Sequence, residues 1–200
     1  MKCIIGLGNP GSRYRFTRHN IGFLAAETLI DTLKAESFEG NSLYESFRTI
    51  FSGGEILIVM PQTYMNNSGF AVRELCQKYS IAFTDLLVVF DDFQIPFGTL
   101  RMRSKGSDGG HNGMASIIYN LENEMIPRLR IGVAGKNIPE HHTHDEMADY
   151  VLSPFEKDEE ESLNDMLRHT TDACKSWIEN GITRTMNLFN KNFLRDANAS

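Results

Sequence analysis

The clearest indication of the fold is Leu86-Leu87-Val88-Val89-Phe90-Asp91-Asp92, an unbroken apolar run followed directly by two carboxylates. A continuous apolar run of this length is typical of a strand that helices cover on both faces, as in a largely parallel sheet. Working outward from it, Cys3–Leu7 and Arg128–Ala134 predict two further strands, and Gly98–Arg103 predicts a short one.

Helical patterns alternate with these strands. The predicted helices cover residues 21–35, 66–79, 114–122, 158–180 and 182–193. A hairpin is predicted over Tyr44–Phe51 and Glu55–Met60, since Ser52-Gly53-Gly54 is a turn signal. Residues 137–147 predict a surface loop, and the acidic run Asp158–Glu161 predicts a solvated helix start. We therefore expect an α/β fold, in which residues 1–200 form a single domain with a twisted mixed β-sheet flanked by helices.

The charge balance argues at first against a nucleic-acid partner. The chain has 200 residues, a net charge of −6 and 41% hydrophobic residues, which is an ordinary globular composition and excludes a disordered chain. However, residues 1–136 carry 14 Lys and Arg against 13 Asp and Glu, whereas the remainder carries 6 against 13. A basic site can therefore still lie in the first two thirds of the chain.

Cysteine usage and hydropathy point to the cytoplasm. Cys3, Cys76 and Cys174 are far apart, which favours free thiols in a reducing compartment. The apolar run near Met1 is too short for the core of a signal peptide, and no long apolar run predicts a membrane helix.

Two motifs favour plain interpretations over specialised ones. Gly6–Gly11 matches G-x-G-x-x-G, but residues 12–18 separate it from the next helix, so a turn-rich loop that holds Asn9 is favoured over a dinucleotide site. The cluster His141–Asp145 resembles a metal site in composition, yet consecutive loop residues rarely converge on one ion. We predict no metal.

Polar side chains stand at the ends of several predicted elements, where an open α/β sheet places its ligand crevice. These residues are Asn9, His19, Asn66, Asp91, His111 and Asn112. Each also has a structural interpretation as a helix cap, a turn residue or a surface histidine. Their shared placement favours a common site.

Several motifs, taken together, resemble those of bacterial-type peptidyl-tRNA hydrolases over nearly the whole chain. They are Gly6–Gly11, Tyr14 with Thr17–Gly22, Pro61–Gly69, Asp91–Gly98, Gly106–Gly113, Arg128–Val133, Tyr150–Phe155 and Met186–Asn190. Departures are mild, such as Gln94 where the family often has an acidic residue. The resemblance implies cleavage of the ester between a peptide and the terminal ribose of tRNA, without metal or cofactor.

The resemblance also implies roles for individual residues. His19 would be the general base that activates water, Asp91 would orient it, and Asn66 would stabilise the oxyanion or position the water. The implied contacts to the peptide and the acceptor end are Asn9, Tyr14, Tyr64, Met65, Asn66 and Asn112. The implied contacts to tRNA phosphates are Arg101, Arg103, Lys105 and Arg130, with Arg128 in the same basic stretch. We expect a cytoplasmic monomer whose partner is peptidyl-tRNA.

Two other functions compete with this hypothesis. A non-catalytic RNA-binding relative would share the fold, and the joint presence of His19, Asp91, Asn9, Asn66 and Asn112 favours the enzyme over it. A dinucleotide-binding protein rests on the Gly6–Gly11 motif alone.

Overall fold

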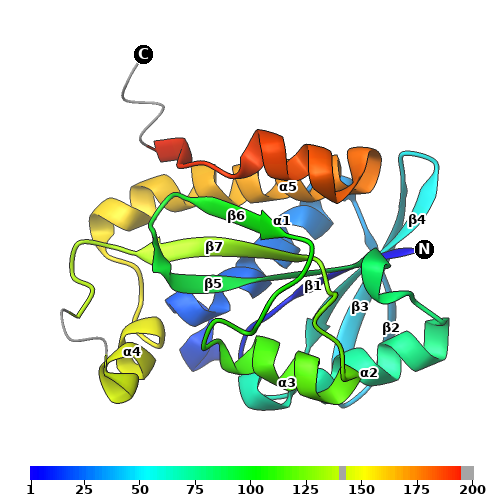
Figure 1. Cartoon of the computed structure of the whole chain (residues 1–200), viewed down its shortest axis with the longest axis horizontal. Helices are drawn as coiled ribbons and strands as arrows, with labels where there is room; N and C mark the ends of the chain where they lie inside the picture. Colours follow the sequence, from blue (N-terminus) through cyan, green and yellow to red (C-terminus); the bar gives the residue numbers. More distant parts are fainter. Residues whose placement is uncertain (140–142, 195–200) are drawn as a thin grey trace.

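The computed structural model describes residues 1–139 and 143–194, and Figure 1 shows a twisted sheet packed between helices. Within those residues, the strands join in one sheet in the order β2-β3-β4-β1-β5-β7-β6. The strands are β1 (Lys2–Gly6), β2 (Glu36–Gly40), β3 (Tyr44–Phe51), β4 (Gly54–Pro61), β5 (Leu86–Pro96), β6 (Leu100–Arg103) and β7 (Arg128–Ala134). The central strands β4, β1, β5 and β7 are parallel, whereas β2, β3 and β6 pair antiparallel to their neighbours. The predicted mixed α/β sheet is confirmed.

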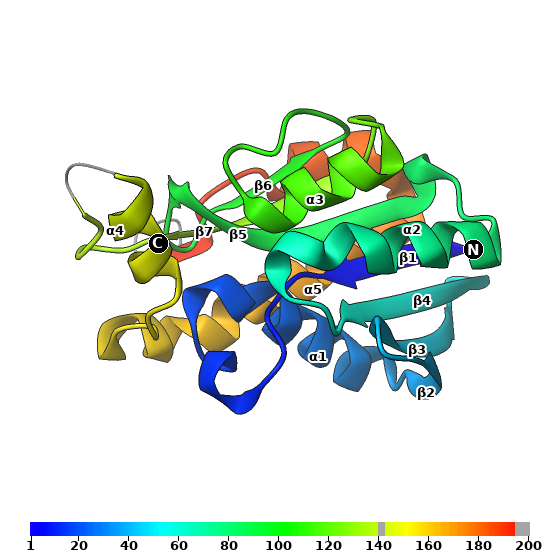
Figure 2. The ribbon, with the colours of Figure 1, turned by 90° about the horizontal axis from the view of Figure 1, so that it is seen from below.

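Helices cover both faces of the sheet (Figure 2). α1 (Ile21–Leu33) and α5 (Lys157–Phe189) pack on one face, and α2 (Ser68–Tyr79) and α3 (Asn112–Leu121) pack on the other. On β5, Leu87 and Val89 join the core beneath α1 and α5, while Val88 and Phe90 join the core beneath α2 and α3. This period of two explains why the run is apolar throughout. In the described ranges, no helix is both long and apolar enough to cross a bilayer.

The three cysteines are free, as predicted, and all three are buried. Cys3 and Cys76 belong to the core on the α2 and α3 side, and Cys174 belongs to the opposite core. Burial raises the pKa of the Cys76 thiol to about 11 and that of Cys174 to about 12. These thiols therefore act as small core residues.

Two elements differ from the prediction near the site. β5 continues to Pro96, so Asp91 and Asp92 lie inside the strand, opposite Ile131 and Gly132 of β7. The pairing with β7, which residue type alone does not reveal, carries the strand past the two charges. The predicted loop 137–147 is wrong at its end, because α4 (His144–Val151) begins there with a capping box between Thr143 and Glu146. Residues 140–142 lie outside the described residues, and with them most of the histidine cluster.

The last helices agree with the prediction except at their end. The helix α5 is interrupted at Gly181, where φ of 77° and ψ of 176° separate two helical segments. The second segment ends at Phe189, and the residues after it run along the edge strand β6 instead. Asn190 accepts a hydrogen bond from the Met102 N–H (2.6 Å) and donates one to the Met102 carbonyl (3.2 Å), so its side chain continues the ladder.

Two further departures follow from tertiary contacts. The strand β2 was not predicted, because all of its residues except Phe38 are exposed and offer no apolar alternation. Glu159, expected to be solvated, is only 6% exposed and pairs with Arg18. The local sequence indicates neither the pairing of β2 with β3 nor that of Glu159 with Arg18.

Candidate active site

A cleft of about 790 Å³ opens where the parallel strands end. Most of the predicted site residues line it, and α4 supplies one wall. The lining residues include Asn9, His19, Tyr64, Met65, Asn66, Asp91, Phe93, His111, Asn112, Met147, Val151 and Leu152. The predicted convergence of separate loops on one crevice is therefore confirmed for these positions. Tyr14 is not among the lining residues; its hydroxyl and ring contact the neighbouring Arg13.

His19 and Asp91 form the polar centre of the cleft. His19 lies in the short 3-10 helix η2 (Arg18–Asn20), which the chain forms just before α1. Its Nδ1 is 2.8 Å from Oδ1 of Asp91, and the side chains are 10% and 2% exposed. In the described part of the chain, Nε2 of His19 has no hydrogen-bond partner. That nitrogen is left for a molecule in the cleft.

Electrostatics fix the charge of this pair. Burial alone would raise the pKa of Asp91, but the charges and hydrogen bonds of His19 and His111 hold it far below the usual range. Burial alone would lower the pKa of His19, but the Asp91 charge and hydrogen bond outweigh it and raise that pKa above its ordinary value. Asp91 is therefore a carboxylate that accepts, and His19 donates its Nδ1–H to it.

His111, one of the polar residues at the ends of predicted elements, is a second histidine on the same carboxylate oxygen, although the family resemblance assigned it no role. Its Nε2 is 3.1 Å from Oδ1 of Asp91. Its Nδ1 accepts the Met114 N–H (3.2 Å) at the start of α3, so the ring proton sits on Nε2 and points to Asp91. The ring lies 4.6 Å from that of Phe90, centroid to centroid. Its position before a predicted helix placed it in the expected crevice, but no local pattern indicates its bond to Asp91.

Asn9 is held by two neighbours. Its Oδ1 accepts the Met65 N–H (2.8 Å), which orients the amide. The Asn20 side chain accepts the Asn9 N–H (2.9 Å) and donates to the Asn9 carbonyl (2.9 Å). Because Oδ1 is occupied, the side-chain NH₂ of Asn9 is the group left to face the cleft. Asn20 was missed as a supporting residue, since nothing in the sequence indicates its partner.

Asn66 and Asn112 are exposed residues on the cleft wall, and neither caps a helix. Asn66 lies in η3 (Met65–Asn67), and α2 starts without a side-chain cap. Asn112 is the first residue of α3, whose cap is His111. The structural interpretation of both as caps is therefore wrong. Their amides are free to bind a ligand.

Gly6 of the first motif and Gly22 of α1 allow close packing between β1 and α1. A Cβ at Gly6 would stand 2.2 Å from the Gly22 carbonyl oxygen, and one at Gly22 would stand 2.4 Å from the Leu7 carbonyl oxygen. The helix begins only after η1 (Ser12–Tyr14) and η2, so its N-terminus does not open at the glycine loop. This matches the predicted turn-rich loop rather than a dinucleotide fingerprint.

The basic residues of β6 and β7 divide into two groups. Arg101 and Arg103 are exposed on one face of β6, because alternate residues of a strand point to the same side. Arg130, across from Arg101, is half-buried and contacts Asp92 (2.9 Å). Arg128 is buried and donates to the carbonyls of residues 107, 124 and 126, so its expected availability is wrong. Burial, reinforced by the Arg130 charge, lowers the pKa of Arg128.

His19, Asp91 and His111 are also the group of described residues that could hold a metal, since their ligand atoms lie within 4.8 Å of one another. A divalent ion would need lone pairs at Nδ1 of His19 and Nε2 of His111. Both nitrogens carry the protons that bind Asp91, so hydrogen bonding accounts for the arrangement.

Comparison with known proteins identifies the family of the chain. A family model described as Peptidyl-tRNA hydrolase matches residues 3–197. A peptidyl-tRNA hydrolase of Sulfurihydrogenibium sp. is 43% identical, covering 97% of this chain and 100% of that protein. One of Persephonella marina is 40% identical, covering 96% and 98%.

A crystal structure of peptidyl-tRNA hydrolase from Acinetobacter baumannii superposes with a TM-score of 0.86 at 29% identity, covering 95% of this chain and 94% of that one. The sequence comparisons and the structural comparison therefore point to the same family. Because the family model and these relatives extend over nearly its whole length, the chain belongs to the peptidyl-tRNA hydrolase family.

Proposed function

We propose that the cleft hydrolyses the ester bond between the C-terminus of a peptide and the terminal ribose of tRNA, with His19 as general base. The observation that carries this proposal is the His19–Asp91 pair, because donation of Nδ1–H to a buried carboxylate leaves Nε2 as an acceptor at the cleft. A positioned base of this kind contributes roughly 10²–10⁴ to a rate.

The reaction follows from that geometry. Nε2 of His19 takes a proton from water as the oxygen attacks the ester carbonyl, and Asp91 stabilises the imidazolium that forms. The bond to the ribose oxygen then breaks, and that oxygen receives the proton from Nε2. His111 acts as a positioning residue. Its Nε2–H donates to Oδ1 of Asp91, the same oxygen that accepts the hydrogen bond from His19.

Amide groups around the cleft supply polar contacts to the substrate. The Asn66 NH₂ would donate to the developing oxyanion or hold the water, and one such donor is worth about 10²–10³ in rate. Asn9 and Asn112 would bind peptide amides or ribose hydroxyls. Met65 and Tyr64, which is 56% exposed at the cleft, would supply apolar contacts.

The tRNA phosphates would bind the basic residues Arg101, Arg103, Lys105 and Arg130. Arg101, Arg103 and Lys105 are exposed, and none of the three forms an ion pair within residues 1–139 and 143–194. Nε of Arg130 is buried without a partner in that same part of the chain, so it retains a donor beyond its bond to Asp92. A few phosphate contacts give a modest salt dependence, with a slope of about −0.9 per contact.

The test is cleavage of a labelled peptidyl-tRNA by His19→Ala. We expect tRNA binding to persist while cleavage falls by at least about 10²-fold. His169→Ala is the matched control, because that imidazole stacks on Phe193 (4.1 Å) and is not among the cleft residues. Free aminoacyl-tRNA serves as the control substrate.

Near-normal turnover by His19→Ala would remove His19 as the base. Binding of tRNA without cleavage by the unmodified chain would favour the non-catalytic RNA-binding alternative. We further propose that the enzyme acts as a cytoplasmic monomer, and the three free, buried cysteines support a reducing compartment.

A further inference from the structure

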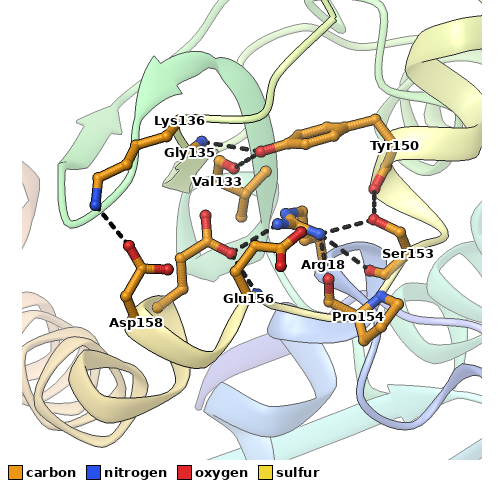
Figure 3. A network of polar contacts seen from close by, with 10 residues as sticks. Arg18, Val133, Gly135, Lys136, Tyr150, Ser153, Pro154, Glu156 and Asp158 are labelled. Carbon is orange, nitrogen blue, oxygen red and sulfur yellow. Dashed lines mark hydrogen bonds and ion pairs between the residues drawn. The ribbon is translucent and has the colours of Figure 1, made fainter.

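Arg18, the neighbour of His19, is an almost fully buried cation that the proposed reaction does not use (Figure 3). The side chain is 1% exposed, and its Nη2 donates to Oε2 of Glu159 (2.6 Å). Its Nη1 donates to Oγ of Ser153 (2.7 Å) and to the Pro154 carbonyl. One guanidinium thus binds Ser153 and Pro154, which lie between α4 and α5, and Glu159 near the start of α5.

Backbone and aromatic contacts reinforce the same attachment. The Arg18 N–H donates to the Ser153 carbonyl (3.1 Å). The guanidinium lies 4.4 Å from the ring centroid of Tyr150. The Tyr150 hydroxyl donates to the Val133 carbonyl (2.8 Å) and accepts the Gly135 N–H (2.9 Å), as Figure 3 shows. The contact therefore reaches the end of β7 as well.

These contacts join two neighbouring parts of the cleft lining. On one side, η2 carries Arg18, His19 and Asn20 in succession. On the other side, Met147, Val151 and Leu152 line the cleft directly before the segment that Arg18 holds. The η2 turn therefore bears the proposed base on one residue and the anchor of the α4 wall on the residue before it.

Stability alone does not account for a buried ion pair. Desolvation of two charges offsets much of their attraction, and apolar residues of similar volume are often as stabilising. Here Nε of Arg18 and Oε1 of Glu159 are also buried without a partner among the described residues, which adds a further cost. A planar guanidinium does supply several directed donors at once, which apolar packing cannot.

We infer that Arg18 is a positioning residue, which sets the place of the α4 wall relative to His19 and thereby the affinity for peptidyl-tRNA. This inference rests on the proposed function of the cleft. His19 is itself held by Asp91, and Asn20 holds Asn9, independently of the guanidinium. Loss of the Arg18 side chain therefore weakens substrate binding while the chemical step remains.

Steady-state kinetics of Arg18→Met test the inference. We expect KM to rise about tenfold, equivalent to about 1.4 kcal/mol of uniform binding, with kcat within about threefold of the unmodified enzyme. Lys2→Met is the matched control. Lys2, at the start of β1, donates to the carbonyls of Trp177 (2.9 Å) and Ile178 (2.8 Å) in α5. Its replacement should therefore lower stability without changing KM.

A double variant separates positioning from stability. Arg18→Met/Glu159→Met removes both charges, so the melting temperature should recover relative to Arg18→Met while KM stays high. Recovery of KM together with stability would overturn the inference, as would an unchanged KM in folded Arg18→Met.

If Arg18→Met does not fold, Arg18→Lys replaces it. The lysine ammonium can keep the ion pair with Glu159 but cannot also reproduce the bonds of the guanidinium to Ser153 and Pro154. We therefore expect KM to rise about threefold, and an unchanged KM would overturn the inference. Cleavage by the unmodified enzyme in the same assay keeps a failure of this inference distinct from a failure of the proposed function.

Discussion

Replacement of Asp91 by asparagine removes one charge from the centre of the site with almost no change in shape. The carboxylate is 2% exposed and its Oδ1 is 2.8 Å from Nδ1 of His19. At an effective dielectric constant of about 20, two unit charges at that separation attract by about 6 kcal/mol. After desolvation, loss of one partner of a buried pair costs about 3–5 kcal/mol. If that cost falls on the imidazolium formed in the reaction, kcat drops by about 10²–10⁴.

The pH dependence of activity tests the same prediction independently, through the direction in which the pKa of His19 moves. Burial works to lower the pKa of His19, but Asp91 outweighs it and raises that pKa. The base acts when neutral, so activity of the unmodified enzyme increases as pH rises through this raised pKa. Without the carboxylate the pKa of His19 falls, and the acid limb of kcat/KM moves to lower pH.

Single-turnover cleavage of labelled peptidyl-tRNA across the pH range measures both effects. Asp85→Asn is the control, because it removes a half-buried carboxylate at the opposite end of β5, just before Leu86. We expect Asp85→Asn to keep the cleavage rate of the unmodified enzyme and the same acid limb of its pH profile. A loss of activity in Asp91→Asn without movement of the limb would refute the electrostatic reasoning, and an unchanged kcat would refute the role of Asp91 itself.

Further predictions concern the tRNA site, the stability of the fold and the hydrogen bonds that position Asn9. Arg103→Ala should weaken tRNA binding more at low salt than at high salt, because exposed charges are screened beyond about 8 Å at physiological ionic strength; equal losses in a filter-binding salt series would contradict this. Arg128→Met should lower the free energy of unfolding by about 2–3 kcal/mol, since it strips hydrogen bonds from buried carbonyls, and denaturant titration measures it. Gly181→Ala should cost about 1–3 kcal/mol in the same titration, because φ of 77° with ψ of 176° is open essentially to glycine alone. Asn20→Ala should lower kcat/KM about tenfold, because it removes two hydrogen bonds that hold the Asn9 backbone. An unaltered kcat/KM would show that Asn9 does not need these bonds.

The strands and main helices could be predicted from local pattern. The run at Leu86–Phe90 is apolar on both faces, and its alternate residues enter the two cores as a sheet between helices requires. The start of α4 could have been predicted too, because Thr143 and Glu146 are spaced as a capping box. The edge strand β2 could not, since it is exposed and buries almost nothing.

The two arginines of one short ladder show the limit of pattern. Arg103 and Arg128 are paired across β6 and β7, and nothing in their local sequence separates them. Arg103 is exposed to solvent, while Arg128 is buried and donates to the Ser107 carbonyl of the glycine-rich loop. The same holds for Glu159, whose acidic run predicts solvent but whose carboxylate meets the buried Arg18.

The sequence by itself determined the α/β architecture and the motifs that carry the family resemblance, because apolar periodicity and short-range spacing are local properties of a chain. Only the tertiary structure decided that His19 and His111, 92 residues apart along the chain, donate to one oxygen of Asp91. It also decided that Arg18 binds Ser153, which follows α4, and Glu159, which lies in α5. Proton placement and charge depend on which groups burial brings within hydrogen-bond distance, and that distance is set by the packing of the whole fold.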